Sequence, residues 1–151
     1  FNTDIPAVYA DPRLIRQVLI NLIGNAIKYS KSQGAIKIHG HVDPQGNLKL
    51  IVEDDGVGIP RSRIREALEP FGQVNMSAES NSIQGTGLGL PLAKAMIELH
   101  NGSFELESDI DQGTKVIMTL PASRVGRKSK KKDESGDTQE ISPFASFASD
   151  R

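Results

Sequence analysis

The sequence has no cysteine and no tryptophan, and aromatic residues make up only 5% of its 151 residues. Without cysteine, the chain has neither a disulfide framework nor a thiolate metal site, which suits a reducing compartment. No apolar run is long enough to span a bilayer, and no signal-peptide pattern is present. Residues 1–123 carry 11 Lys and Arg against 14 Asp and Glu, so we expect no nucleic acid partner.

Length and charge divide the chain into two parts. Residues 1–123 are enough for one domain with one core. Residues 124–151 include a basic run, RKSKKK at Arg127–Lys132, and continue with mainly polar residues, so we predict a disordered basic and polar tail. The alternative is a docking segment for a partner or a neighbouring domain, formed by Ile141, Phe144 and Phe147.

The stretch from Asp11 to Ser30 is predicted to be a long amphipathic helix. Asp11 followed by Pro12 is a start signal, a capping carboxylate before a proline at the first helical position. Apolar residues recur at helical spacing and fill a wide arc of this helix: Leu14, Ile15, Val18, Leu19, Leu22, Ile23, Ala26 and Ile27.

A polar stripe runs beside this apolar arc. Gln17, Asn21, Asn25 and Lys28 are four, four and three residues apart, which places them along one line of the helix. Asparagine is a poor helix former and gains nothing from repetition at this spacing on a solvated helix. The stripe is either a polar face that meets water or the wall of a ligand cleft.

A predicted hairpin ends in an acidic turn that contains glycine. Ala35–Val42 and Leu48–Glu53 alternate as half-buried strands do, and Asp43–Asn47 suits a tight connection. The second strand runs directly into the sequence DDGVGIP at residues 54–60. Glycine lets a backbone approach a ligand, and a carboxylate can accept a hydrogen bond from an amino group. The alternative is a simple turn.

The middle of the chain combines a predicted lid with a glycine-rich helix start. Arg61–Glu69 is predicted to be a short polar helix, and the long polar loop Asn75–Gly85 is predicted to be a lid. The sequence GTGLGL at residues 85–90 then opens a helix that runs to His100. Glycines at every second position expose backbone N–H groups at a helix N-terminus, which suits phosphate. Their spacing matches neither a Walker loop nor a Rossmann turn.

Two more alternating strands, Ser103–Ser108 and Thr114–Leu120, complete the predicted domain. The order of elements predicts an α/β two-layer sandwich with a mixed, mostly antiparallel sheet and helices on one face. A crevice between the two long helices and the lid would gather the stripe, Asp54 and the glycine-rich loop. Amide oxygens suit Mg²⁺, the acid suits an adenine amino group and the glycine amides suit a triphosphate, so together they indicate an ATP site.

Four motifs resemble the sequence boxes of sensor histidine kinases. Asn21–Ser30, Asp54–Pro60, Pro70–Phe71 and Gly85–Leu90 are similar, in this order, to the asparagine, first glycine, phenylalanine and second glycine boxes. The resemblance covers about residues 1–121. It implies the Bergerat-type ATP-binding fold shared with gyrase, Hsp90 and MutL, and the activity of a protein-histidine kinase that uses ATP and Mg²⁺.

The resemblance also implies roles for individual residues. Asn25 would coordinate Mg²⁺, and Lys28 would contact a phosphate. Asn21 would contact either the phosphates or the coordination shell of the metal. These three are the expected catalytic residues. Asp54 would accept a hydrogen bond from the adenine amino group, and Tyr29 would pack on the base or the ribose. The other implied ATP-binding residues are Gly56, Gly58, Ile59, Phe71, Gly85, Thr86, Gly87, Leu88, Gly89 and Leu90.

Two positions depart from the family pattern. The hydrolytic relatives have a water-activating glutamate four residues before the metal-binding asparagine, where this chain has Asn21. An amide cannot take a proton, so phosphoryl transfer to a protein side chain is favoured over hydrolysis. Gln73 stands where many members have an arginine or lysine. Either phosphoryl transfer is slower than in those members, or another cation takes the place of that arginine or lysine: Arg61, Arg63 or Arg65.

The phosphate acceptor is expected outside this chain. None of His39, His41 and His100 sits in a long helix beside an acid, as the family's acceptor does, so we expect structural roles for all three. Because the chain begins at Phe1, we expect a piece of a longer, homodimeric phosphoprotein whose upstream dimerisation domain carries the acceptor and whose partner is a response regulator. The domain is expected to be cytoplasmic, in a protein that is cytoplasmic or anchored in the inner membrane. Two other functions stay open, an ATP hydrolase and a module that binds nucleotide as a signal.

Overall fold

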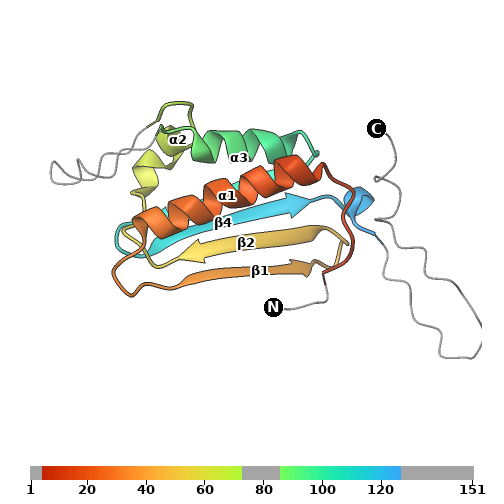
Figure 1. Ribbon diagram of the computed structural model, residues 1–151, viewed down its shortest axis with the longest axis horizontal. Coiled ribbons are helices and arrows are strands. Elements are labelled where there is room, and N and C mark those ends of the chain that lie inside the picture. Colours follow the sequence, from red (N-terminus) through yellow and green to blue (C-terminus); the bar gives the residue numbers. More distant parts are fainter. Residues whose placement is uncertain (1–4, 73–85, 127–151) are drawn as a thin grey trace, which may run out of the picture.

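A four-stranded sheet with helices on one face makes up the fold in the computed structural model (Figure 1). The structure describes residues 5–72 and 86–126. The strand order is β1-β2-β4-β3, and each of these three pairs is antiparallel. The strands are β1 (Ile36–Val42), β2 (Leu48–Asp54), β3 (Ser103–Asp109) and β4 (Gly113–Leu120). The predicted α/β two-layer sandwich is confirmed, and its sheet is antiparallel throughout the described part of the chain.

The helix α1 (Pro12–Tyr29) has both ends where the sequence predicts them. The Asp11 carboxylate accepts a hydrogen bond from the Arg13 backbone N–H at 2.8 Å, and Pro12 occupies the first helical position. At the other end, the Ser30 hydroxyl donates to the Ala26 carbonyl at 2.6 Å. The predicted helix start is therefore confirmed.

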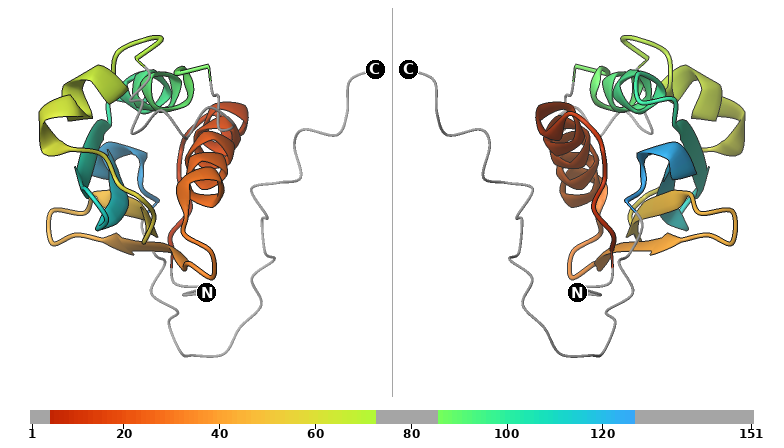
Figure 2. Two further views of the ribbon diagram at one scale, coloured as in Figure 1. Left: turned by 90° about the vertical axis from the view of Figure 1, so that its left-hand side faces the viewer. Right: turned by 90° about the vertical axis from the view of Figure 1, so that its right-hand side faces the viewer.

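The helices α1 and α3 (Gly89–Glu98) lie side by side over the sheet (Figures 1 and 2). Between the layers is a core to which both helices, β2 and β4 contribute: Val18, Leu22, Ala26, Leu48, Val52, Ala93, Ile97, Val116, Met118 and Leu120. Successive side chains of a strand point to opposite faces. Asp54 therefore follows Leu48 and Val52 onto the face of β2 that the helices cover.

The segment after the first glycine turn differs from the prediction. Instead of one helix over Arg61–Glu69, the structure has a 3-10 turn, η1 (Arg61–Arg63), and a four-residue helix, α2 (Ile64–Ala67). Helical geometry is disfavoured for a residue that directly precedes a proline. Because Pro70 follows Glu69, α2 does not extend through Glu69. The predicted lid at residues 75–85 lies outside the described residues.

The two ends of the described chain pair with each other. Val8 forms an antiparallel bridge with Val125, and the Gly126 N–H donates to the Ala7 carbonyl at 2.7 Å. The short turn η2 (Ala122–Arg124) precedes this contact. The contacts of the domain thus continue to Gly126, while the rest of the predicted tail lies outside the described residues.

His100 connects the start of α1 with the end of α3. It is 4% exposed, its Nε2 accepts the Asp11 backbone N–H at 3.0 Å, and its Nδ1 donates to the Met96 carbonyl at 2.7 Å. This is a structural role. Among the residues that the structure describes, no helix has the length and apolar character needed to cross a membrane.

Candidate functional site

The polar stripe of α1 faces the start of α3. Asn21 Nδ2 donates to the Gly89 carbonyl at 3.4 Å, and Asn21 Oδ1 accepts from Gln17 Nε2 at 2.9 Å. Asn25 lies beside the same glycine, because a Cβ built at Gly89 would be 3.4 Å from Asn25 Nδ2. Asn21 and Asn25 therefore line a helix–helix contact, and the stripe is more than a face that meets water.

Asn25 has a side-chain amide that is available to a ligand. The residue is half-buried, and its amide makes no hydrogen bond to any other residue that the structure describes. No group of three His, Asp or Glu side chains in these same residues could hold a metal ion. Mg²⁺ usually keeps several waters and takes one or two protein oxygens plus substrate phosphates. A single amide oxygen beside a helix start fits that cation when a triphosphate accompanies it.

The C-terminal end of α1 meets the first glycine turn. The Tyr29 carbonyl accepts the Val57 N–H at 3.2 Å. A Cβ at Gly56 would lie 2.3 Å from the same carbonyl oxygen, so this approach requires glycine. Lys28 Nζ lies 4.9 Å from the centroid of the Tyr29 ring, a distance at which a cation and an aromatic face attract each other.

Asp54 ends β2 beside this turn. Its Oδ1 accepts the Gly56 N–H at 2.8 Å and the Thr114 N–H at 3.3 Å. Burial raises the pKa of Asp54 above its ordinary value of 3.8, and the two N–H groups oppose that rise because they stabilise the charged form. Its Oδ2 makes no hydrogen bond within the described part of the chain. Asp54 therefore has one oxygen held by the backbone and one free to accept from an amino group.

The turn between β3 and β4 packs against the glycine turn and forms hydrogen bonds with its backbone. The Asp111 N–H donates to the Val57 carbonyl at 2.9 Å. Gly58 has a φ of +70°, and a Cβ at this position would lie 1.9 Å from the Asp109 carbonyl oxygen. The Ile59 N–H donates to the Ser108 hydroxyl at 2.7 Å. The backbone that follows Asp54 is thus held by residues about 50 positions further along the chain.

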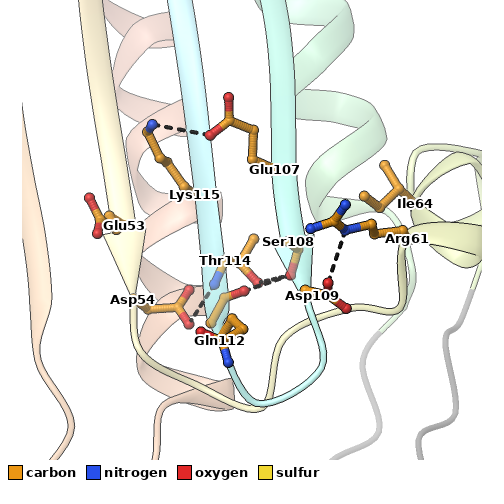
Figure 3. A pocket seen from close by; sticks show the side chains of 11 residues that line it. Glu53, Asp54, Arg61, Ile64, Glu107, Ser108, Asp109, Gln112, Thr114 and Lys115 are labelled. Carbon is orange, nitrogen blue, oxygen red and sulfur yellow. Dashed lines mark hydrogen bonds and ion pairs between the residues drawn. The ribbon is translucent and has the colours of Figure 1, made fainter.

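Ser108 and Thr114 are two further candidate residues, and the sequence patterns do not predict them. Figure 3 shows both beside Asp54, Ser108 from β3 and Thr114 from β4. The strand register pairs Asp54 with Thr114, and Thr114 with Ser108. The sequence does place a hydroxyl residue at each of the two facing ends of the last predicted strands. This pattern would indicate the two residues only if the pairing of β4 with β2 were known.

The phenylalanine and second glycine motifs also touch. Phe71 is 73% exposed and has a φ of +63°, a backbone conformation that is rare for a bulky residue and tends to occur at functional sites. A Cβ at Gly87, whose own φ is +67°, would lie 3.0 Å from the Phe71 carbonyl carbon. This contact requires glycine at position 87.

The remaining predicted residues lie around the start of α3. Thr86 is exposed, and the Leu88 carbonyl accepts the Leu92 N–H at 3.0 Å. Leu90 packs against the core, so its side chain contributes packing. The first backbone N–H groups of a helix have no partner inside it, and in α3 they belong to this segment. Gly85 lies outside the described residues.

A hollow near Asp54 extends over the sheet face that the helices do not cover. Glu53, Lys115 and Glu107 lie in one row on that face (Figure 3). The hollow shares Asp54, Ser108 and Thr114 with the site described above, and three further acids and two bases line it: Glu53, Glu107, Asp109, Arg61 and Lys115. The net negative charge of this lining repels a triphosphate, which favours the helix side of the sheet as the nucleotide site.

The sequence matches the family described as "Histidine kinase-, DNA gyrase B-, and HSP90-like ATPase" over residues 10–124. The chain belongs to this family, and the predicted family is confirmed. Within it, the chain is 36% identical over 132 residues to the cell-division control histidine kinase PdhS of Brucella canis, a match that covers 83% of this chain and 13% of that protein. The chain thus spans only a small part of the curated relatives that it matches.

Solved structures of histidine kinases have the same fold. The catalytic domain of histidine kinase ThkA, in a nucleotide-free form, is 32% identical with a TM-score of 0.62, and the match covers 75% of this chain and 70% of that domain. Full-length ShkA in complex with AMPPNP is 25% identical with a TM-score of 0.66, and the match covers 78% of this chain and 23% of that protein.

Proposed function

We propose that this chain is the ATP-binding catalytic domain of a two-component sensor histidine kinase. The observation that carries this proposal is that one helix touches both glycine motifs, with Asn25 beside Gly89 and Tyr29 beside Gly56. A nucleotide that lies along α1 can therefore reach the amide, the start of α3 and Asp54 in one pose. The matched family and the histidine kinase relatives support the same reading.

The base is recognised at the end of β2. Asp54 Oδ2 accepts a hydrogen bond from the adenine amino group, and Gly56 and Gly58 let the purine lie close to the backbone. Ile59 and Tyr29 supply apolar surface for the base or the ribose. Asp54 keeps its Oδ1 on two backbone N–H groups, so the acceptor is oriented before the base arrives.

The phosphates are held between α1 and α3. Backbone N–H groups of the glycine-rich segment at residues 85–89 and the Lys28 ammonium bind phosphate oxygens, with Phe71, Thr86 and Leu88 bordering them. Asn25 Oδ1 holds Mg²⁺, which when bound shields the negative charge of the triphosphate. These groups position the γ-phosphate and offset its charge, and positioning and electrostatic stabilisation are most of what phosphoryl transfer requires of a protein.

Asn21 favours transfer to a protein acceptor over hydrolysis. Its amide nitrogen donates to the Gly89 carbonyl and its oxygen accepts from Gln17, so its side chain fastens α1 to α3. An amide has no basic site that could take a proton from water. In the proposed reaction, an acceptor histidine nitrogen attacks the γ-phosphorus, the bond to the β,γ-bridging oxygen breaks, and ADP leaves.

Ion pairs distinguish the three arginines that could supply a cation in place of Gln73. Arg61 pairs with Asp109 at 2.9 Å, and Arg63 pairs with Glu66 at 2.7 Å. Arg65 is exposed and forms no ion pair with the residues that the structure describes. Of the three arginines, Arg65 is therefore our candidate for this role, because it would not have to give up an acid in order to bind a phosphate.

The proposed activity needs partners outside this chain. The acceptor histidine lies on the dimerisation domain of a homodimeric protein, and the phosphoryl group passes from it to an aspartate of a response regulator. Because the domain uses ATP, we place it in the cytoplasm, in a protein that is cytoplasmic or anchored in the inner membrane.

The test is phosphoryl transfer in trans. The chain is incubated with γ-labelled ATP, Mg²⁺ and the dimerisation domain of the same protein. We expect acid-labile label on that domain's histidine and little free phosphate. Rapid release of phosphate without labelled protein would indicate a hydrolase instead. Tight ATP binding with neither product would indicate a module that binds nucleotide as a signal.

A further inference from the structure

We propose that Ser108 is a positioning residue for base recognition, acting through Thr114 and the glycine turn that follows Asp54. The proposal rests on the proposed function, because it assumes that Asp54 receives the adenine amino group. Ser108 is half-buried at the end of β3 and makes three hydrogen bonds. It lies beside the proposed base site without being one of its expected contacts (Figure 3).

The hydrogen bonds of Ser108 have a single consistent direction. A serine hydroxyl has one proton and two lone pairs. Its proton goes to the Gly113 carbonyl, at 2.7 Å, and one lone pair accepts the Ile59 N–H, also at 2.7 Å. The Thr114 hydroxyl, 3.1 Å away, must then be the donor to the second lone pair. The Ser108 hydroxyl is therefore fully used.

This arrangement determines whether the base site offers hydrogen-bond donors or acceptors to a ligand. Because the Thr114 proton points to Ser108, the Thr114 oxygen offers only lone pairs to a ligand. Asp54 Oδ2 likewise offers lone pairs, and the Thr114 backbone N–H is already used by Asp54 Oδ1. The site thus presents two acceptors, which suit a base with an exocyclic amine and disfavour one with an oxygen at the same position.

Ser108 also fixes where the acceptors stand. It ties Ile59, at the end of the glycine turn, to the strand that neighbours Thr114. A Cβ at Gly113 would lie 1.9 Å from the Asp54 carbonyl oxygen, so the β3–β4 turn also touches the backbone of Asp54. Without the Ser108 hydroxyl, the Ile59 N–H and the Gly113 carbonyl lose a partner, and the Thr114 hydroxyl is free to turn its proton toward the ligand.

The test compares base selectivity among Ser108 variants of the full chain. Affinities for Mg²⁺ with a non-hydrolysable ATP analogue, and with the same analogue lacking the exocyclic amine, are measured by calorimetry. The selectivity is the ratio of the two dissociation constants. We expect Ser108→Ala to lower this ratio about three- to tenfold, the range for loss of one hydrogen bond. Ser108→Thr keeps the hydroxyl and should restore the ratio.

Two further variants make the result decisive. Ser103→Ala, at the exposed start of the same strand, is the matched control and should leave the ratio unchanged. Ser108→Cys preserves the size of the side chain with a weak donor and acceptor, so it should also lower the ratio, and it replaces Ser108→Ala if that variant does not fold.

Each outcome decides the proposal. Reduced selectivity with rescue by threonine supports it. Equal weakening of both nucleotides, or a lower melting temperature with unchanged selectivity, overturns it and assigns Ser108 to the fold alone. If wild-type protein shows no selectivity and Asp54→Asn changes neither affinity, the adenine role of Asp54 fails as well, which distinguishes the failure of the proposed function from that of Ser108.

Discussion

The base end and the phosphate end of the proposed site are built differently. At the base end, Asp54 Oδ1 is held by two backbone N–H groups, and Gly58 fits against the Asp109 carbonyl oxygen with no room for a side chain. At the phosphate end, the Asn25 amide has no hydrogen-bond partner among the described residues, and Thr86 is exposed.

The difference shows how the two ends would bind their parts of a nucleotide. At the base end, the backbone is already held by hydrogen bonds, so little conformational entropy is lost when a ligand binds. Affinity there depends on how well the base fits this preformed backbone. Unpaired polar groups at the phosphate end are available to the ligand and its cation, so affinity there depends on individual side chains. Side-chain substitutions at the phosphate end should therefore affect mainly binding, whereas changes to the glycine backbone at the base end should affect mainly the fold.

The largest effect is expected at the phosphate end, from Asn25→Ala. Losing the only proposed protein ligand of Mg²⁺ should weaken Mg²⁺-dependent ATP binding about 100-fold, while the melting temperature stays near that of wild type because Asn25 forms no hydrogen bond in the described residues. Calorimetry with Mg²⁺ and with EDTA measures this effect. Ile20→Ala, on the same helix and 56% exposed, is the control; an unchanged titration for Asn25→Ala would remove the metal role.

The next effect is on the fold, from Gly58→Ala at the base end. A methyl group at a φ of +70° and 1.9 Å from a backbone oxygen should reduce the free energy of unfolding by about 2 kcal/mol. Gly24→Ala is the matched control, because nothing lies within 4 Å of its built Cβ and alanine should stabilise α1 by about 1 kcal/mol. Urea denaturation measures both. Equal stabilities for the two variants would mean that the turn is not held as described.

Asp54→Asn should separate binding from stability. ATP affinity should fall about tenfold, the effect of losing a hydrogen bond to a charged group, whereas an analogue without the exocyclic amine should lose less. Burial raises the pKa of Asp54, so the folded protein holds a proton that the unfolded chain has released. Ionised Asp54 therefore costs stability, and this cost develops as the pH rises from 3.8 through the folded pKa.

Two pH series check the sign of this effect. The amide introduced by Asp54→Asn carries no charge, so the variant should gain stability relative to wild type as the pH rises through that window and keep the gain at neutral pH. In wild type, the preference for ATP over the amine-free analogue should weaken as the pH falls toward the folded pKa. A variant that is less stable than wild type at neutral pH would show that the carboxylate is better solvated than its burial suggests.

The smallest effect is expected far from both ends, from Asp11→Ala. This substitution removes the helix cap on the Arg13 N–H and should cost about 1 kcal/mol of stability. ATP affinity should not change, because Asp11 lies at the end of α1 opposite the glycine turn. Thermal melts and nucleotide titration together measure both quantities, and a parallel loss of affinity would mean that the two ends of α1 are coupled.

The sequence predicts the phosphate end better than the base end. The repeat of Asn21 and Asn25 on one line of α1 follows from the helical period alone. Away from the site, the cap at Asp11 likewise identifies where the same helix starts. Both features depend on neighbours a few residues apart, which a sequence displays directly.

The base end depends on pairs that are distant along the chain. Ser108 and Thr114 come together with Asp54 because β4 inserts between β2 and β3, and strand order is not visible in alternation. At the phosphate end, the positive φ of Phe71 could not be predicted either, because bulky residues rarely adopt it. The break of the predicted helix over Arg61–Glu69 could have been anticipated from Pro70.

The most direct test of the account is a crystal structure of this chain with Mg²⁺ and a non-hydrolysable ATP analogue. We predict that this structure will show the adenine amine on Asp54 Oδ2, Mg²⁺ on Asn25 Oδ1, and the phosphates between α1 and α3. A nucleotide seated instead in the hollow beside Glu53 and Lys115, or an Asn25 side chain turned away from the phosphates, would contradict it.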